Sequence, residues 1–448
     1  MTEIKEPESQ EQEATPAEKP SHKPTDDEIG NMLIEKWKGN VAYFYSQWHV
    51  YKSGVWMPLD EMSIERKVWE LLISLKYIGI RPADHKKNAV LKYLQAFLGV
   101  SDDLIDKQPD FINVQNGMFN IKTMKLSPHK RDYYMTSQLP FAYDPNADCP
   151  VFRRFLNQSL IKPNGETDVD LIMLLMEAIG YSLTYNTDFR LSFWLIGASG
   201  TGKSIMINVL QELAGSSYTS IDLDEMNNNP YQIADIAGKR LVTFTEPKSN
   251  AVLADNHYKR LVSQDAIMAR QIFGKPFRFV PQCKVWGAMN NPPRVLDRSD
   301  AIFNRIIIIP MNNVVSEKDK DYQLINKLRL ELAGIFNMAL IGLKRIKNSG
   351  KFTDVQQSSD ARDDYKKEND YELAFIDDWC IRDASEKLKA QTLYDAYSAW
   401  CRRNGVHPKS SVKVARDWQR LGFSRIRSNG TWYAGVKLNQ SGNANVSY

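Results

Sequence analysis

The order of apolar and polar positions divides the first third of the chain into a tail and a small domain. Residues 1–27 hold four prolines, many Glu and Gln and no aromatic residue, which is typical of a disordered acidic tail. Aromatic residues begin near Trp37, and strand patterns flank a turn at Ser53 and Gly54. We therefore predict a small α/β domain over residues 28–145, whose aromatic side chains form its core.

Three further patterns complete that domain. Apolar residues at helical spacing predict helices over 61–75 and 89–98. Asn116 and Gly117 predict a hairpin, because both residues accept positive φ. A segment rich in Pro, Asn and Asp over 144–150 then marks the boundary to the next domain.

The central part of the chain alternates helical and strand patterns, which predicts an open α/β sheet. A helical lead-in over 151–183 precedes an apolar strand over 191–196, and the later apolar runs predict strands over 240–247, 284–289 and 306–310. Two β-prone runs within 269–280 predict a protruding hairpin. This second domain is predicted over residues 146–350.

The last part of the chain predicts a separate DNA-binding fold. Helical patterns cover 323–346 and 371–380, then 392–403 and 411–421, and a hairpin with Asn429 and Gly430 at its turn follows. Helix, helix, hairpin is the order of a winged helix, which we predict over residues 370–438.

Charge is distributed unevenly along the 448 residues, although the net charge is only +4. Residues 1–30 carry nine acids and three lysines, whereas residues 381–438 carry twelve Lys or Arg and four acids. Such a basic segment favours a polyanion partner, with ordinary solvated surface as the alternative. The four cysteines lie far apart, which argues against a zinc site or a disulfide framework and for a reducing compartment, the host cytoplasm. No apolar run approaches the length of a membrane span, so we expect no membrane partner.

A phosphate-binding pattern follows the first strand of the central domain. Residues 197–204 fit G-x-x-x-x-G-K-[ST], and a helical pattern follows at once. The glycines allow the tight turn that directs backbone N–H groups at phosphates, Lys203 reaches the β- and γ-phosphates, and Ser204 binds Mg²⁺. A chance glycine-rich turn is the alternative. The predicted ATP-binding residues are Gly197, Ala198, Ser199, Gly200, Thr201, Gly202, Lys203 and Ser204.

Two polar residues end the next strands. Glu246 is our candidate for polarising the attacking water and for supporting Mg²⁺ together with Ser204. Asn290 offers a neutral amide at the same edge of the sheet, where ligands of open α/β sheets gather. A turn made by the Asn and Pro residues over 290–293 is the alternative interpretation of that segment.

Basic residues supply the remaining candidates. Lys275 lies at the tip of the predicted hairpin with Arg270 and Arg278 on its arms, a pattern that suits phosphate contact. Arg305 precedes a buried strand and is a candidate arginine finger for a neighbouring subunit's site. In the winged helix, Arg425 and Arg427 share one face of their strand and are candidate DNA contacts, whereas an idle basic cap is the alternative.

Taken in order, these motifs resemble the superfamily III helicases of phage, plasmid and mobile-element replication, which include satellite-phage and poxvirus primase-helicases. The resemblance extends over nearly the whole chain beyond residue 28. It rests on segments 111–121, 128–129, 143–150, 197–204, 241–246, 259–261, 265 and 269–270. Lys275 takes the position of the family's hairpin tip, Asn290 that of its sensor and Arg305 that of its arginine finger.

The resemblance implies an AAA+-like ATPase core that forms a ring, expected to be a hexamer, and translocates on single-stranded DNA in the 3′ to 5′ direction using ATP and Mg²⁺. Two positions depart from the family pattern: Thr245 replaces an acid before the Glu, and Asn304 replaces the first of two paired arginines, with Arg298 as a reserve finger. No primase domain is recognised before residue 28, so we expect a separate primase as partner.

The residues leave two other function classes open. One is a DNA-binding replication initiator in which ATP is an assembly switch and unwinding is minor. The other is a phosphate-loop ATPase that acts on protein or packages DNA. The sequence favours the helicase, an ATP hydrolase that contacts both single-stranded and duplex DNA.

Overall fold

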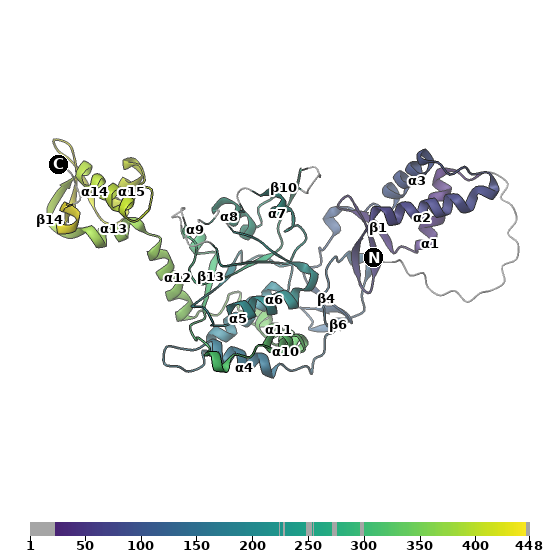
Figure 1. Cartoon of the computed structure of the whole chain (residues 1–448), viewed down its shortest axis with the longest axis horizontal. Coiled ribbons are helices and arrows are strands. Elements are labelled where there is room, and N and C mark those ends of the chain that lie inside the picture. Colours follow the sequence, from purple (N-terminus) through teal and green to yellow (C-terminus); the bar gives the residue numbers. More distant parts are fainter. Residues whose placement is uncertain are drawn as a thin grey trace.

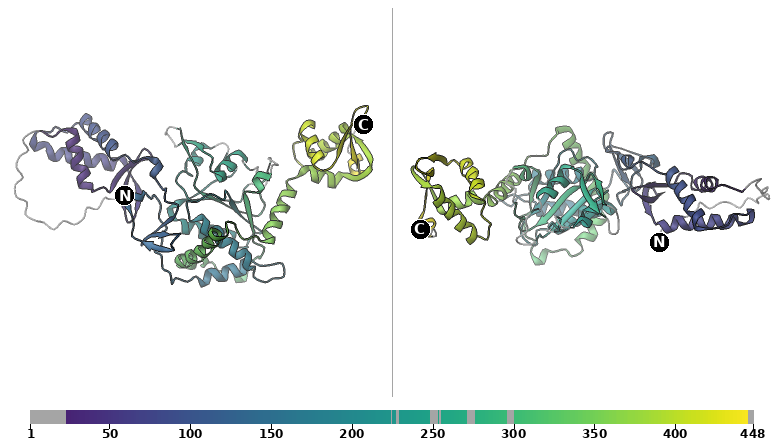
Figure 2. Two further views of the ribbon diagram at one scale, coloured as in Figure 1. Left: turned by 180° about the vertical axis from the view of Figure 1, so that it is seen from behind. Right: turned by 90° about the horizontal axis from the view of Figure 1, so that it is seen from above.

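The computed structural model describes residues 23–223, 225–226, 229–247, 253, 255–270, 276–295 and 300–444. The described chain forms three bodies in a row, with a central sheet between an N-terminal and a C-terminal body (Figure 1). Figure 2 shows the same order from behind and from above. Most of the predicted tail, Lys275 and Arg298 lie outside the described residues.

The N-terminal body packs three helices against an antiparallel sheet of order β1-β2-β3. Its helices and strands are α1 (Asp26–Trp37), β1 (Val41–Phe44), β2 (Gln47–Lys52), β3 (Val55–Leu59), α2 (Glu61–Ser74) and α3 (Asp84–Phe97). Ser53 at φ 50° and Gly54 at φ 87° form the predicted turn between β2 and β3. α1 begins inside the predicted tail, because the Glu28 carboxylate accepts the Thr25 N–H at 2.8 Å and so completes the first turn.

A second antiparallel sheet connects this body to the centre. It comprises β4 (Phe111–Val114), β5 (Gly117–Asn120) and β6 (Lys125–Ser127). Phe119 and Phe141 lie 5.7 and 5.4 Å from the ring of Phe336. These strands therefore share a hydrophobic core with the helices of the central body. The core extends across the domain boundary that the sequence predicts at residue 145.

The hairpin between β4 and β5 forms as predicted, but its turn differs. Val114 pairs with Gly117, so Gln115 and Asn116 are the turn residues, and Asn116 does not have positive φ. Its side chain instead donates to the Tyr143 carbonyl at 2.9 Å and accepts the Tyr143 N–H at 2.8 Å. Asn116 thus binds a distant backbone segment, a role that no local turn rule predicts.

The central body is built on five parallel strands in the order β13-β7-β12-β9-β8. The strands are β7 (Ser192–Ile196), β8 (Tyr218–Ser220), β9 (Leu241–Thr245), β12 (Lys284–Met289) and β13 (Ile306–Pro310). β7, β9, β12 and β13 follow the apolar runs of the sequence, whereas β8 has only three residues and was not predicted. An antiparallel ribbon of β10 (Ile267–Arg270) and β11 (Pro276–Phe279) lies outside this sheet.

Helices cover both faces of the sheet (Figure 1). One face is covered by α4 (Pro150–Ser159), α5 (Val169–Ser182), α6 (Lys203–Ala214), α10 (Leu324–Arg329) and α11 (Leu332–Ser349). The other carries α7 (Pro230–Ala234), α8 (Asp255–Ser263) and α9 (Asp300–Phe303). The helix predicted over 323–346 is broken between α10 and α11, where Leu330 is 89% exposed. Among the described residues, no helix has the length and apolar character that crossing a membrane requires.

The C-terminal body follows α12 (Gln356–Glu368), a helix that the sequence did not predict. It comprises α13 (Tyr371–Trp379), β14 (Cys380–Lys389), α14 (Ala390–Arg403), α15 (Ser411–Arg420), β15 (Ser424–Arg427), β16 (Thr431–Leu438) and the short α16 (Gln440–Ala444). The sheet order is β14-β16-β15, and β14 was missed because seven of its ten residues are exposed. Asn429 at φ 49° and Gly430 at φ 121° make the predicted hairpin turn.

A buried polar network joins the N-terminal body to the central body at the amino ends of the parallel strands. The Tyr185 hydroxyl donates to Asp106 Oδ1 at 2.9 Å and lies 2.5 Å from the Ser137 hydroxyl. Arg240, which is fully buried just before β9, donates to Ser137 Oγ at 2.7 Å and stacks on the Tyr185 ring at 4.3 Å. Burial raises the pKa of Asp106 and raises that of Tyr185 to about 12. The network fixes the segment around Asp106 against the sheet.

We predict that Tyr185→Phe lowers the free energy of unfolding by about 1–3 kcal/mol, because it leaves buried polar atoms of Asp106 and Ser137 with one partner fewer. Equilibrium denaturation measures this change. Tyr322→Phe is the matched control, since that residue is 78% exposed and its hydroxyl donates to Glu317 on the surface; its effect should stay within about 0.5 kcal/mol. Equal effects of both substitutions would show that the network adds no stability.

Candidate functional site

The register of the parallel strands brings three of the predicted site residues to one edge of the sheet. Ile196 pairs with Met289, so Gly197 and Asn290 each follow their strands at the same level. Ala288 pairs with Thr245, which puts Glu246 beside Met289. The carboxyl ends of β7, β9 and β12 therefore meet around the start of the 197–204 loop, as the sequence predicts.

The 197–204 loop is held closely by its neighbours. A Cβ on Gly197 would lie 1.9 Å from the Met311 carbonyl oxygen, and one on Gly202 would lie 2.7 Å from the Phe155 ring at a φ of 94°. Neither position tolerates a side chain. The Val315 N–H donates to the Gly200 carbonyl at 3.1 Å, so the segment after β13 holds the far side of the loop. Ala198, Ser199, Gly200 and Ser204 are nevertheless exposed to solvent.

Lys203 begins α6 and points back into the loop. Its side chain is only 6% exposed, and Nζ donates to the Gly197 and Ala198 carbonyls at 2.7 Å each. Burial lowers the pKa of Lys203, and the negative charge of Glu246 opposes that shift. The ammonium and the carboxylate thus act on one another across the sheet edge.

Glu246 takes a backbone conformation that is uncommon for a residue with a side chain. Its φ is 42°, and its N–H donates to the Ala288 carbonyl at 3.0 Å, directly after β9 ends. Left-handed non-glycine residues are enriched at functional sites, where surrounding bonds maintain the strain. The side chain is exposed, as are those of Thr245 and Asn290. Carboxylate, hydroxyl and amide oxygens are therefore accessible at this edge.

Arg305 lies at the opposite edge of the same sheet. It precedes β13, whose last residue pairs with Ile196, so Arg305 is about 20 Å along the strand from the level of Gly197. Its Nε donates to Ser263 Oγ at 2.9 Å, and its guanidinium also donates to the Ala301 carbonyl. Within one subunit the structure does not bring Arg305 to the 197–204 loop.

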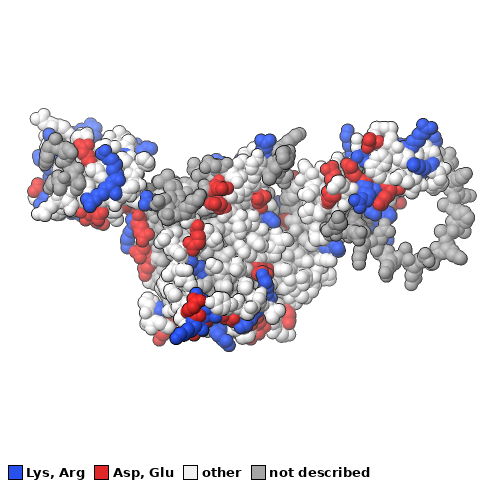
Figure 3. All heavy atoms as spheres, in the orientation of Figure 1, with Lys and Arg blue, Asp and Glu red and all other residues white. Residues whose placement is uncertain are grey.

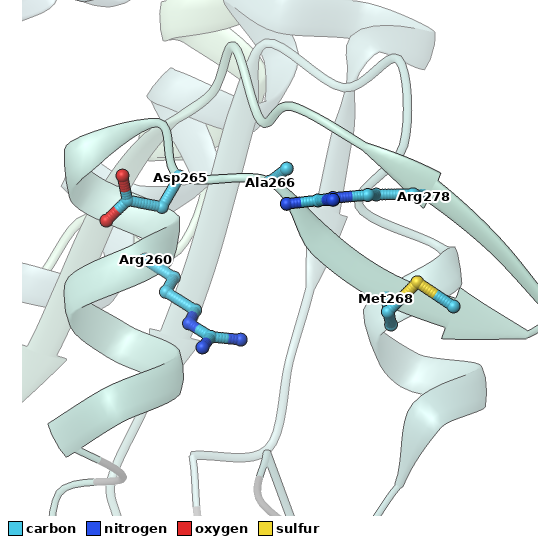
Figure 4. A pocket seen from close by; sticks show the side chains of 5 residues that line it. All are labelled: Arg260, Asp265, Ala266, Met268 and Arg278. Carbon is cyan, nitrogen blue, oxygen red and sulfur yellow. The ribbon is translucent and has the colours of Figure 1, made fainter.

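The predicted hairpin is present as the β10–β11 ribbon, whose tip over 271–275 lies outside the described residues. Met268 pairs with Arg278 and Arg270 pairs with Pro276, so both arginines occupy the exposed face of the ribbon. The sequence analysis did not name a third arginine, Arg260, as a candidate phosphate contact. Figure 4 shows Arg260 and Arg278 extending from α8 and β11 into one hollow of about 380 Å³, with the Asp265 carboxylate turned away.

Neither Arg260 nor Arg278 forms an ion pair with another described residue. Both side chains are exposed, and Ala266 and Met268 complete the lining of the hollow. Two guanidinium groups without a carboxylate partner form a local site for an anion. The sequence signal for Arg260 was its place in the 259–261 segment, but only the fold shows that it faces Arg278.

The C-terminal body has fewer free basic groups than its sequence indicates. Lys409 pairs with Asp417 and Glu372, and Arg420 pairs with Asp370 at 2.7 Å. Residues 370–380 add four acids and no base, so residues 370–438 carry twelve basic and eight acidic side chains, a net charge of +4 instead of the +8 of residues 381–438. Figure 3 still shows Lys and Arg side chains grouped on this body.

Four of the remaining basic groups of that body lie on α15 and β15. Lys413 and Arg416 are exposed on α15 and form no ion pair with the described residues. Arg425 pairs with Tyr433 and Arg427 with Thr431, so both lie on one face of β15, as their spacing predicts. These four side chains are among the candidates for contact with a polyanion.

Comparison with known proteins identifies similar segments at both ends of the chain. Residues 31–161 match a family described as D5 N terminal like, and residues 367–417 match one described as poxvirus D5 protein-like. Residues 195–305, which contain the 197–204 loop, match a family described as of unknown function.

Two viral proteins and one solved structure are similar over most of the chain. Candidate helicase L207/L206 of Acanthamoeba polyphaga mimivirus is 24% identical over 345 residues, covering 70% of this chain and 35% of the viral protein. Candidate helicase 121R of Invertebrate iridescent virus 3 is 22% identical over 472 residues, covering 84% of this chain and 50% of that viral protein. The chain thus spans half or less of the length of these curated relatives.

The apo C-terminal region of NrS-1 superposes with a TM-score of 0.51 at 13% identity, covering 92% of this chain and 98% of that one. This similarity supports the mixed α/β fold with its parallel sheet and nothing finer. Two segments of this chain are thus similar to D5-like families, and the two viral relatives carry names of helicases.

Proposed function

We propose that this chain is an ATP-driven DNA helicase that acts in the replication of a virus, phage or other mobile element. The observation that carries the proposal is the meeting of the 197–204 loop, Glu246 and Asn290 at the carboxyl edge of one parallel sheet. The viral relatives named as candidate helicases and the D5 segments support the replication role. An initiator that uses ATP only as an assembly switch is the alternative function.

The proposed hydrolysis of ATP assigns one role to each residue at this edge. Lys203 exchanges the Gly197 and Ala198 carbonyls for the β- and γ-phosphates, which are stronger acceptors for an ammonium group. Glu246 accepts a proton from the attacking water or orients it, and the Asn290 amide holds the water or the γ-phosphate. Glu246 and Asn290 each follow a strand that ends at this edge, and this proximity supports the proposed roles.

The same edge fits a magnesium ion. Ser204 and Glu246 are exposed and would hold the ion through hydroxyl and carboxylate oxygens, the ligand type that Mg²⁺ prefers. Thr245 adds a hydroxyl where an acid is usual in the family that this chain resembles. A bound Mg²⁺ neutralises charge on the phosphates.

The position of Arg305 leads us to propose that the chain acts as an oligomer. Because it lies about 20 Å from its own loop, it can reach a γ-phosphate only in a neighbouring subunit. A ring in which each 197–204 loop faces the Arg305 edge of the next subunit meets this need, and the resemblance to superfamily III helicases favours a hexamer. Arg305 must then exchange its bonds with Ser263 and Ala301 for the phosphate.

Two surfaces provide the contacts with DNA. In the proposed ring, Arg270 and Arg278 of the β10–β11 ribbon and Arg260 of α8 hold the translocated single strand through its phosphates, in the 3′ to 5′ direction by resemblance. Lys275, which lies outside the described residues, keeps its predicted role as a further phosphate contact. We infer that the C-terminal body is a winged helix, with α15 and the β15–β16 hairpin contacting duplex DNA through Lys413, Arg416, Arg425 and Arg427.

Lys203→Ala is expected to lower ATP turnover at least about 100-fold, because it removes the cation that stabilises charge on the transferred phosphoryl group. Phosphate release by the purified variant is the measurement, with an unfolding midpoint to verify its fold. Lys92→Ala is the matched control, since Lys92 is exposed on α3 of the N-terminal body, away from the loop; it should hydrolyse ATP at the wild-type rate. Normal turnover of Lys203→Ala would refute the assigned ATP site.

The second expectation concerns subunit interfaces. Lys203→Ala and Arg305→Ala subunits are each inactive alone, but in equal random mixture about a quarter of the interfaces join an intact loop to an intact finger. Hydrolysis should recover to about that fraction of the wild-type rate and vary with the mixing ratio. If verified mixed assemblies stay inactive at every ratio, Arg305 does not act across an interface.

A further inference from the structure

The sheet of the C-terminal body has two faces with different environments. Tyr433 and Val436 on β16 are buried beneath the helices, and the Tyr433 ring packs against Trp418 at 5.2 Å. Side chains alternate along a strand, so Trp432 points to the opposite, outer face. There it pairs across strands with Lys389 of β14 and Ile426 of β15, so these three side chains share the outer face.

Two lysines lie over the Trp432 ring on this outer face. Lys387 Nζ is 5.4 Å and Lys389 Nζ is 5.7 Å from the ring centroid, and both side chains are exposed. Neither lysine forms an ion pair with any residue that the structure describes. The indole Nε1 donates to the Ser428 carbonyl at 3.0 Å, which fixes the edge of the ring and leaves its face to the lysines.

The acidic side chains near this face are already paired. Asp383 and Glu386 of β14 lie 2.8 and 3.8 Å from Lys437 Nζ. The other outer-face neighbours, Ser424 and Ala434, carry no charge. The spot around Trp432 is therefore positively charged and partly apolar, with Ile426 39% exposed at its rim.

An aromatic ring with flanking cations matches the chemistry of an unpaired nucleotide strand. Exposed cation–π contacts are worth only about 0.5–1 kcal/mol, so the lysines can leave the ring at small cost. A nucleobase stacked on an aromatic side chain contributes about 1–3 kcal/mol, and the freed ammonium groups then bind the adjoining phosphates. Duplex DNA does not offer such a base face, because its bases are stacked on one another.

We propose that the outer face of the β14-β16-β15 sheet is a binding site for single-stranded nucleic acid, in which a base stacks on Trp432 and Lys387 and Lys389 contact the flanking phosphates. The site is separate from Lys413 and Arg416, which lie on α15 on the other side of the body's core. Binding at this site requires no ATP, so an experiment can test it independently of the proposed motor activity.

The test uses the full chain without nucleotide and a single-stranded oligothymidine in which one thymine is replaced by 5-bromouracil. Irradiation should cross-link this base to the peptide that contains Trp432, as located by mass spectrometry. Trp432→Leu should abolish that cross-link, and Trp432→Phe, which keeps an aromatic face, should retain it. A duplex of the same sequence should give no cross-link at this peptide.

Affinity measurements by fluorescence anisotropy complete the test. The double variant Lys387→Glu with Lys389→Glu should weaken single-strand binding, and it should flatten the slope of log affinity against log salt by about 1.4, which is about 0.7 for each phosphate that a lysine no longer neutralises. Duplex affinity should not change. The matched control, Lys413→Glu with Arg416→Glu, should show the reverse selectivity.

Two results would overturn the proposal. One is a cross-link confined to other peptides, with single-strand affinity and salt slope unchanged in the lysine variant. The other is binding of an oligoglutamate peptide that depends on Lys387 and Lys389 while single-strand affinity does not, which would identify the face as a docking site for an acidic protein.

Discussion

Parallel pairing of β7 with β12, and of β12 with β9, is the constraint on which the rest of the structure depends. Because side chains alternate along a strand and the ends are set by register, a slip of one residue would move Glu246 or Asn290 away from the start of the loop. Close packing enforces that register. The Met311 carbonyl occupies the space of a Gly197 side chain, and buried Trp194 and Trp286 fill opposite faces of the sheet. The chemistry at the edge follows from this packing.

Much of the central body could be predicted from the sequence, because its signals are local. The apolar runs predicted both ends of β12 and of β13 correctly. The spacing of Gly197, Gly202 and Lys203 predicted where the loop lies and where α6 begins. The break between α10 and α11 and the short β8 were missed, because their formation depends on tertiary packing and not on periodicity. The Asn116 turn was predicted with the wrong geometry for the same reason: its side chain binds Tyr143, 27 residues away.

Charge was the least predictable property. The basic segment over 381–438 is partly neutralised by Asp370 and Glu372, which precede it in sequence and fold into the same body. Conversely, Arg260 and Arg278 lie 18 positions apart and converge on one hollow only when α8 meets the ribbon. Net charge over a window predicts a polyanion partner, but it does not identify which side chains stay free of ion pairs in the folded body.

The central claim is that ATP hydrolysis at the sheet edge drives strand separation, and a forked duplex with one labelled strand tests it most directly. Labelled single strand should accumulate when the wild-type chain is given ATP and Mg²⁺, and it should not accumulate with a non-hydrolysable ATP analogue or with the Lys203→Ala chain. ATP hydrolysis and fork binding without any release of the labelled strand would contradict the account and favour an ATP-switched initiator.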